Sequence, residues 1–198
     1  MGLKFLPGKL GAEQQLALLA ELRAVMEEAP LFTPTMPRSG KPMSVRMTNC
    51  GPLGWVTDKE RGYRYQATHP VTGKPWPAMP QALLDLWQDV AGYRAPPEAC
   101  LVNYYHGDAR MGLHQDKDEE DFDAPVVSVS LGDTAIFRAG GRSRRDPARQ
   151  IELESGDVVV LCGEDRLAFH GIDSVLAGTS DLLPEGGRIN LTLRPPCW

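Results

Sequence analysis

The stretch that decides the fold is Leu113-His114-Gln115-Asp116-Lys117-Asp118, read together with Phe169-His170-Gly171-Ile172 further along the chain. Two imidazoles and one carboxylate form the ligand set of a non-haem Fe(II) centre that keeps positions open for a co-substrate and dioxygen. Side chains alternate along an extended segment, so His114 and Asp116 project to one face and can bind one ion. His170 has to arrive from another strand.

This signal is weak when taken alone. A chain with 4 histidines and 26 acidic residues is expected to contain about half a chance match to His-Xaa-acid. A second match, His106-Gly107-Asp108, is present, and we discount it because residues 108–112 look like a turn, which would hold a metal poorly. The alternative for each histidine is an exposed or hydrogen-bonded imidazole. The strand expected to bring His170 is the apolar run 156–161.

The composition predicts one globular, water-soluble unit. The chain has 198 residues, of which 42% are hydrophobic and 24% charged. No apolar run is long enough for a signal peptide or a membrane span, so we expect a cytoplasmic monomer with no membrane partner. The four cysteines form no Cys-Xaa-Xaa-Cys pair, which favours reduced, structural thiols at Cys50, Cys100, Cys162 and Cys197.

Any contact with nucleic acid is expected to be local, because the net charge is −5. The best local candidate is the Gly-rich segment 138–149, with five arginines against one aspartate. Such a run can equally be the solvated end of a hairpin.

Two segments have helical periodicity and one has the alternation of a hairpin. Residues 11–29 predict a helix that Pro30 ends, with an apolar stripe at Leu16, Leu19, Leu22 and Met26. A second helix follows Pro80 and ends before Gly92, with a stripe at Leu83, Leu84, Trp87 and Val90. Between the helices, alternating aromatic residues on either side of a charged turn predict a β-hairpin over residues 55–65, and residues 34–54 are rich in proline and glycine.

From about residue 100 the pattern changes to short strands separated by turns. We expect strands at 100–105, 125–131, 134–138, 150–153, 157–161, 167–170 and 188–194. Strands at this spacing predict a sandwich or jelly roll, so the fold class is mainly β with flanking helices (α+β).

The last strand has a polar face and an apolar face. Its polar face is formed by Arg188, Asn190, Thr192 and Arg194. This face must meet water or a bound anion, since burying an unpaired guanidinium is costly. The two arginines lie about 20 Å apart along the strand, and inward-reaching side chains could bracket a rod-like dicarboxylate. Asn103 and Tyr105 share a face of an earlier strand and could bind the same ligand. The alternative is a solvated edge strand.

Together these residues carry a family resemblance. The segments 103–105, 114–118, 169–171 and 188–194 have the order and spacing of the AlkB family of Fe(II)- and 2-oxoglutarate-dependent dioxygenases, and the match extends upstream through 47–51, 53–55 and 74–80. The chain resembles the bacterial AlkB branch over residues 40 to 195.

The resemblance implies a double-stranded β-helix, or jelly roll, at 96–198, preceded at 1–95 by helices and a nucleotide-recognition lid, all in one structural unit. It implies that Fe(II) is held by His114, Asp116 and His170, with dioxygen as a co-substrate. It implies that 2-oxoglutarate is bound by Asn103, Tyr105, Arg188, Asn190 and Arg194. It implies substrate contacts from Met47, Trp55, Tyr63, Asp118, Glu119 and Arg144.

The activity implied by the resemblance is oxidative dealkylation of 1-methyladenine and 3-methylcytosine in DNA. The co-substrate 2-oxoglutarate becomes succinate and CO2, an N-methyl carbon is hydroxylated, and the product loses formaldehyde. Single strands should be favoured over duplex, because no base has to be extruded from a pair. The alternatives are an RNA demethylase or other 2-oxoglutarate oxygenase on the same fold, and a non-catalytic nucleic-acid-binding module.

Three departures from the family pattern bear on substrate preference and on the reach of the lid. Leu161 stands where close relatives carry a tryptophan, one residue is inserted between Trp55 and Tyr63, and Asp108 makes the preceding loop more acidic. None of them falls on the expected iron or 2-oxoglutarate residues.

Overall fold

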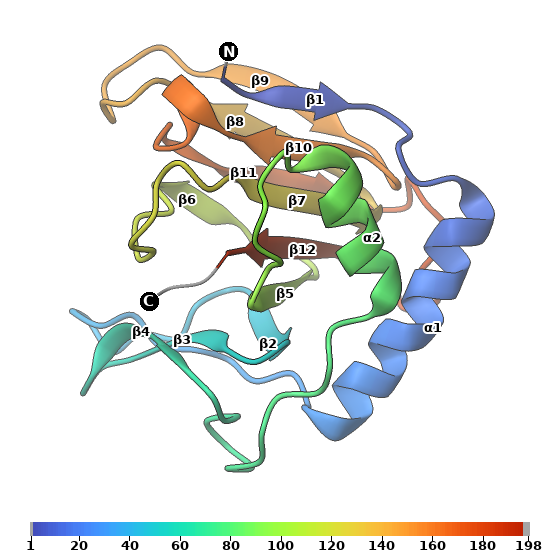
Figure 1. The fold of residues 1–198 in the computed structure, drawn as a ribbon, viewed down its shortest axis with the longest axis vertical. Helices are drawn as coiled ribbons and strands as arrows, with labels where there is room; N and C mark the ends of the chain where they lie inside the picture. The colour runs from blue at the N-terminus through green and yellow to red at the C-terminus, as the bar shows by residue number, and fades with distance from the viewer. Residues whose placement is uncertain (1, 196–198) are drawn as a thin grey trace.

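The computed structural model describes residues 2–195, which form two β-sheets, a separate hairpin and two α-helices (Figure 1). The larger sheet contains β1 (Lys4–Leu6), β2 (Arg46–Cys50), β5 (Ala99–Tyr105), β7 (Val126–Gly132), β10 (Val158–Leu161) and β12 (Arg188–Arg194). The smaller sheet contains β6 (Met111–His114), β8 (Thr134–Ala139), β9 (Arg149–Leu153) and β11 (His170–Leu176). The hairpin pairs β3 (Gly54–Asp58) with β4 (Gly62–Gln66), and the helices are α1 (Ala12–Glu28) and α2 (Gln81–Val90).

The two sheets pack face to face around an inner core. The larger sheet has the order β1-β10-β7-β12-β5-β2 and the smaller sheet the order β6-β11-β8-β9, and all of their pairings are antiparallel. Leu101 and Val159 of the larger sheet share one apolar cluster with Phe137 and Ile172 of the smaller one. The predicted jelly roll is confirmed.

Both helices cover the outer face of the larger sheet, and the hairpin lies on the opposite side of the molecule (Figure 1). In α1 the buried residues are Leu18, Leu19, Leu22 and Val25, so the predicted stripe was wrong at Leu16, which is 59% exposed. Leucine and alanine run continuously from Leu16 to Ala20, and packing on the sheet selects which of them are buried. In α2, Leu86 is buried, whereas Leu84 and Val90 are only half-buried. Neither helix of the described residues is long and apolar enough to span a bilayer.

Two strand predictions were wrong in position. His170 is the first residue of β11, not the last residue of a strand at 167–170, because residues 171–176 carry the pairing with β8. The run expected to deliver His170 forms β10, which lies in the other sheet. The proline- and glycine-rich region 34–54 also contains β2, whose pairing with β5 extends the larger sheet.

The last strand lies inside the larger sheet, hydrogen-bonded to β5 on one side and to β7 on the other. All seven residues of β12 are buried. Its apolar residues Ile189, Leu191 and Leu193 join the core under the helices, so its polar residues face the space between the two sheets. The alternative of a solvated edge strand is therefore wrong.

The cysteines have structural positions. Cys50 and Cys100 are cross-strand partners on β2 and β5, fully buried, and they carry free thiols. The thiol of Cys162 donates a hydrogen bond to the Gly2 carbonyl (2.9 Å). Cys197 lies outside the described residues.

Candidate active site

Three side chains converge where β6 and β11 meet. His114 ends β6, Asp116 follows it by two residues, and His170 begins β11. The Nε2 atoms of His114 and His170 each lie 3.6 Å from a different carboxylate oxygen of Asp116. The potential ligand atoms of all three lie within 4.8 Å of one another, a spacing that suits one metal ion. Among residues 2–195, no other cluster of histidine, cysteine and acidic side chains could hold a metal ion. The discounted His106 does not belong to this cluster.

The backbone orients both imidazoles. His114 Nδ1 donates to the Gly112 carbonyl and His170 Nδ1 donates to the Ala168 carbonyl, each at 2.9 Å. A proton on Nδ1 leaves the Nε2 lone pair free to bind a metal. Burial and the neighbouring His170 lower the pKa of His114, which favours the neutral imidazole.

Asp116 is held as a carboxylate. Burial alone would raise the pKa of Asp116, but the charge of Arg194 and the two imidazoles outweigh burial and hold it well below its usual range. Arg194 Nη2 donates to Asp116 Oδ1 at 2.9 Å. Two imidazoles and one carboxylate fit Fe(II), because this ligand set leaves positions for other ligands.

Arg188 is a buried cation with no counter-charge among residues 2–195. Its side chain is fully buried, Nη2 donates to Ser130 Oγ (2.9 Å), and the guanidinium carbon lies 5.3 Å from the centre of the Tyr105 ring. Nε and Nη1 have no hydrogen-bond partner among residues 2–195. Burial lowers the pKa of Arg188 and raises that of Tyr105 to about 12. A buried, unpaired guanidinium is costly unless an anion completes it, so this site fits a carboxylate ligand.

Two asparagines lie beside Arg188 on the same inner surface. Asn103 and Asn190 are Cα partners on β5 and β12. The Asn190 amide donates to Ser128 Oγ (2.7 Å) and to the Val129 carbonyl (3.1 Å). Asn103 Oδ1 has no partner in the described part of the chain. All five residues expected at 2-oxoglutarate thus lie on two neighbouring strands, β5 and β12, and their contact with it stays a prediction.

Comparison with known proteins decides the family. The model of the 2OG-Fe(II) oxygenase superfamily matches residues 2–194. Over 188 residues the chain is 57% identical to the alpha-ketoglutarate-dependent dioxygenase AlkB homolog of Caulobacter vibrioides, which covers 95% of this chain and 84% of that protein. Over 181 residues it is 49% identical to the alpha-ketoglutarate-dependent dioxygenase AlkB of Escherichia coli, covering 89% and 82%. The chain belongs to the AlkB family.

The fold agrees with this assignment. The solved structure of OsALKBH1 superposes with a TM-score of 0.81 at 32% identity, covering 98% of this chain and 97% of that one. The AlkB-family protein is therefore an Fe(II)- and 2-oxoglutarate-dependent dioxygenase that uses dioxygen, as its resemblance implied.

On the substrate side, the hairpin of this AlkB-family dioxygenase reaches the segment that follows Asp116. The Trp55 indole donates from Nε1 to Asp118 Oδ2 at 2.8 Å. Tyr63 stacks on Trp55, with ring centroids 5.4 Å apart and an interplanar angle of 24°. Tyr63 and Asp118 are exposed, whereas Trp55 is largely buried. The structure thus brings three of the predicted substrate residues together.

The other three predicted substrate residues have different surroundings. Met47 is fully buried in the inner core, on the same face as its cross-strand partner Asn103. Glu119 is buried and accepts hydrogen bonds from Tyr65 Oη (2.5 Å) and Arg166 Nη2 (3.0 Å). Arg144 lies over the Phe169 ring, 5.0 Å from its centre. Direct substrate contact by these residues stays a prediction.

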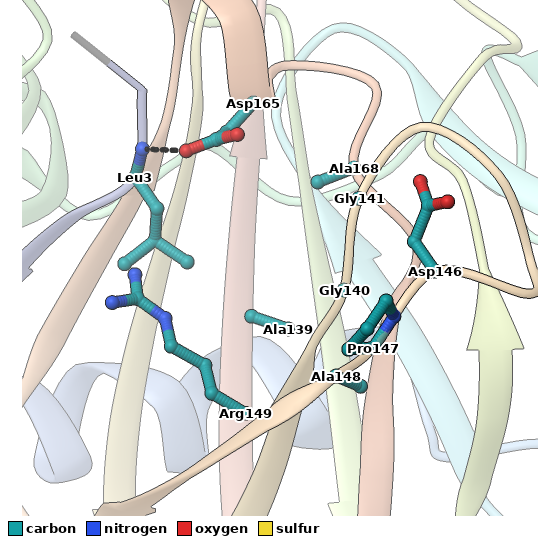
Figure 2. A pocket seen from close by; sticks show the side chains of 10 residues that line it. All are labelled: Leu3, Ala139, Gly140, Gly141, Asp146, Pro147, Ala148, Arg149, Asp165 and Ala168. Atoms are coloured by element: carbon teal, nitrogen blue, oxygen red, sulfur yellow. Dashed lines mark hydrogen bonds between the residues drawn. The ribbon is translucent and has the colours of Figure 1, made fainter.

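The arginine-rich loop is tied to the segment that carries His170. Gly140 and Phe169 are joined by a backbone hydrogen bond of 2.8 Å, as are Phe169 and Gly141. Residues of this loop line one side of a cavity of about 580 Å³ (Figure 2). It is lined by Leu3, Ala139, Gly140, Gly141, Asp146, Pro147, Ala148, Arg149, Asp165 and Ala168. The lining does not include the three metal-binding candidates.

Sequence reasoning missed two residues of the site. Tyr65 lies two residues after Tyr63 on β4. Because side chains two residues apart on a strand share a face, this spacing could have placed Tyr65 beside Tyr63. Arg166 is 1% exposed and donates to the Ala124 and Asp116 carbonyls (2.7 Å each) as well as to Glu119. Nothing in the local sequence marks Arg166, since its partners lie more than 40 positions away.

Proposed function

We propose that this AlkB-family dioxygenase removes N-linked alkyl groups from bases in DNA by oxidation, with 1-methyladenine and 3-methylcytosine as substrates. The observation that carries the proposal is the Trp55–Asp118 pair, an aromatic ring and a carboxylate joined by a 2.8 Å hydrogen bond, with Asp118 two residues beyond Asp116 of the His-Asp-His cluster. Both lesions carry positive charge on the base. A cationic ring gains from stacking on an indole and from a nearby carboxylate.

The residues divide the work. His114, Asp116 and His170 would hold Fe(II), and Arg188 would bind a carboxylate of 2-oxoglutarate. With both bound, the site supplies the oxidative chemistry that converts 2-oxoglutarate and dioxygen to succinate and CO2 and hydroxylates the N-methyl carbon. The hairpin holds the base over the site and excludes water around the reacting carbon. The hydroxymethyl product then releases formaldehyde.

Asp118 contributes selectivity. The indole N–H of Trp55 fixes one carboxylate oxygen and leaves the other available, in an exposed position, for the cationic base. A neutral base would gain less from this carboxylate than a charged one. An alkyl group on the pairing edge also weakens the base pair, so a damaged base is extruded at lower cost than a normal one.

Several finer properties belong to the same proposal. We expect single strands to be better substrates than duplex, with RNA as the alternative substrate. We expect residues 1–95 to supply the lid and 96–198 the catalytic core within one unit, which the presence of β1 and β2 in the larger sheet supports. A monomer in the reducing cytoplasm is consistent with the free thiols of Cys50 and Cys100.

The test is anaerobic reconstitution with Fe(II), then addition of oxygen and 2-oxoglutarate, following succinate and formaldehyde with methylated and unmethylated oligonucleotides. Formaldehyde released only with the methylated oligonucleotide, lost in His114→Ala and kept in His106→Ala, supports the proposal. Matched RNA and DNA oligonucleotides rank the two nucleic acids. Succinate without formaldehyde from any oligonucleotide would refute the substrate assignment.

A further inference from the structure

The hydroxyl of Tyr65, on strand β4 of the hairpin, contacts two buried charged side chains. It donates to Glu119 Oε1 at 2.5 Å and accepts from Arg194 Nη1 at 3.0 Å. A phenol has one proton to donate, and its oxygen can accept at the same time. The Tyr65 hydroxyl thus donates one hydrogen bond and accepts another. These two bonds, here called the polar anchor, attach the hairpin to the core in addition to packing.

The anchor continues to the metal-binding candidates. The same Arg194 donates from Nη2 to Asp116 Oδ1 at 2.9 Å, and Asp116 Oδ2 lies 3.6 Å from His170 Nε2. Tyr65, Arg194 and Asp116 therefore form a continuous path from the hairpin to a predicted iron ligand. Because a guanidinium is planar and rigid, a change at one of its nitrogens reorients the other two.

The network around this path is balanced in charge and shielded from water. Two carboxylates, Asp116 and Glu119, face two guanidiniums, Arg166 and Arg194, and the side chains are at most 7% exposed. In such surroundings each lost partner leaves a desolvated group unsatisfied. Tyr65 is the member that the hairpin contributes. Undocking of the hairpin would remove a donor from Glu119 and an acceptor from Arg194.

Arg194 keeps the N–H of Nε for a ligand. Its Nε atom is buried and has no hydrogen-bond partner within residues 2–195, although both terminal nitrogens are engaged. A carboxylate of 2-oxoglutarate at Nε would fix the plane of the guanidinium. The fixed plane would hold Nη1 in position for the Tyr65 hydroxyl.

We propose that Tyr65 is a positioning residue that couples docking of the β3–β4 hairpin to the binding of 2-oxoglutarate at Arg194. The inference rests on the proposed contact between Arg194 and 2-oxoglutarate. Such coupling is reciprocal, so the co-substrate favours the docked hairpin and the docked hairpin favours the co-substrate. The base-stacking side chains of the hairpin are then in place before oxidation begins.

The first experiment measures amide hydrogen exchange in residues 54–66 of the full chain loaded with Mn(II), a redox-inert substitute for Fe(II), with and without 2-oxoglutarate. We expect 2-oxoglutarate to slow exchange in the wild-type hairpin about tenfold. In Tyr65→Phe, which keeps the ring and loses the hydroxyl, we expect a change of less than about twofold. Thermal unfolding of the same samples shows whether the variant is folded.

The matched control is Tyr93→Phe. The Tyr93 hydroxyl donates to Asp121 Oδ2 at 2.6 Å, a similar tyrosine–carboxylate bond outside the hairpin and outside the network. This variant should keep the tenfold response. Two outcomes would overturn the proposal. One is a tenfold slowing of exchange in Tyr65→Phe, and the other is a wild-type hairpin whose exchange does not change with 2-oxoglutarate.

A second measurement follows succinate and formaldehyde together with a methylated oligonucleotide. We expect the ratio of succinate to formaldehyde to rise about fivefold in Tyr65→Phe and to stay at the wild-type value in Tyr93→Phe. An unchanged ratio in Tyr65→Phe counts against the proposal. If the wild type releases no formaldehyde from any oligonucleotide, the proposed DNA substrate is wrong, while the exchange experiment still decides the role of Tyr65.

Discussion

His114 and His170 are direct cross-strand partners on β6 and β11, and their rings lie 4.5 Å apart at an interplanar angle of 53°. Facing positions on antiparallel strands place both side chains on one face. The approach of the two strands depends on Gly171, because a Cβ atom there would lie 2.5 Å from the Met111 carbonyl oxygen. A residue without a side chain thus sets the spacing of the two imidazoles.

Gly171→Ala should weaken metal binding by about tenfold to a hundredfold. The added methyl group would push β6 away from β11 and carry His114 with it. Titration of the apo protein with Mn(II) measures the affinity. Gly112→Ala is the matched control on β6, since a Cβ atom there meets no atom within 4 Å. Equal affinities for the two variants would show that the strand spacing does not depend on Gly171.

Arg188→Met should stabilise the protein in the absence of ligand and weaken its affinity for 2-oxoglutarate. Removing a buried, unpaired charge is expected to raise the free energy of unfolding by about 1–3 kcal/mol. Losing two charged hydrogen bonds of about 1.5 kcal/mol each corresponds to a roughly hundredfold weaker affinity. Urea denaturation and calorimetric titration measure the two effects.

The control for Arg188→Met is Arg138→Met, which removes an exposed guanidinium 3.4 Å from Asp173. Surface pairs of this kind contribute little, so both quantities should stay close to wild type. Destabilisation of Arg188→Met would mean that the guanidinium is compensated in the ligand-free protein.

Trp55→Phe should raise the KM for a methylated oligonucleotide about tenfold, because the variant keeps an aromatic ring but releases the Asp118 carboxylate. Succinate formed without any oligonucleotide should not change. Steady-state kinetics measure both. Trp87→Phe removes a comparable indole hydrogen bond, to the Ala95 carbonyl at 2.9 Å, from a helix away from the hairpin and should leave the KM unchanged. A normal KM for Trp55→Phe would remove this pair from base recognition.

Arg166→Met should lower the free energy of unfolding by about 3 kcal/mol or more, since it leaves the buried Glu119 carboxylate with one cation fewer. The double variant with Glu119→Gln should recover part of the loss, because the uncompensated charge is then gone. Urea denaturation of the single and double variants forms the thermodynamic cycle. Additive losses would show that Arg166 acts through its bonds to the Ala124 and Asp116 carbonyls and not through Glu119.

Local patterns predicted the bounds of three elements. The first helix, the hairpin and the last strand lie within one residue of their expected bounds. Errors arose where local pattern was ambiguous. Apolar residues cover more than one face of α1, so the sequence could not choose between Leu16 and Leu18. Strand β2 was hidden in a proline- and glycine-rich region, because its pairing with β5 is a long-range interaction.

The sequence by itself predicted the candidate metal ligands and determined the polar face of the last strand. The residue types show which side chains can bind a metal or an anion, and the alternation of side chains along a strand shows which of them share a face. The tertiary structure alone decided that β12 lies inside a sheet, that Arg188 has no counter-charge within the described residues, and that Tyr65 joins the hairpin to Arg194. The Tyr65 and Arg194 side chains are 129 positions apart. Contacts over such separations are set by how the sheets pack, and they leave no periodicity in the sequence.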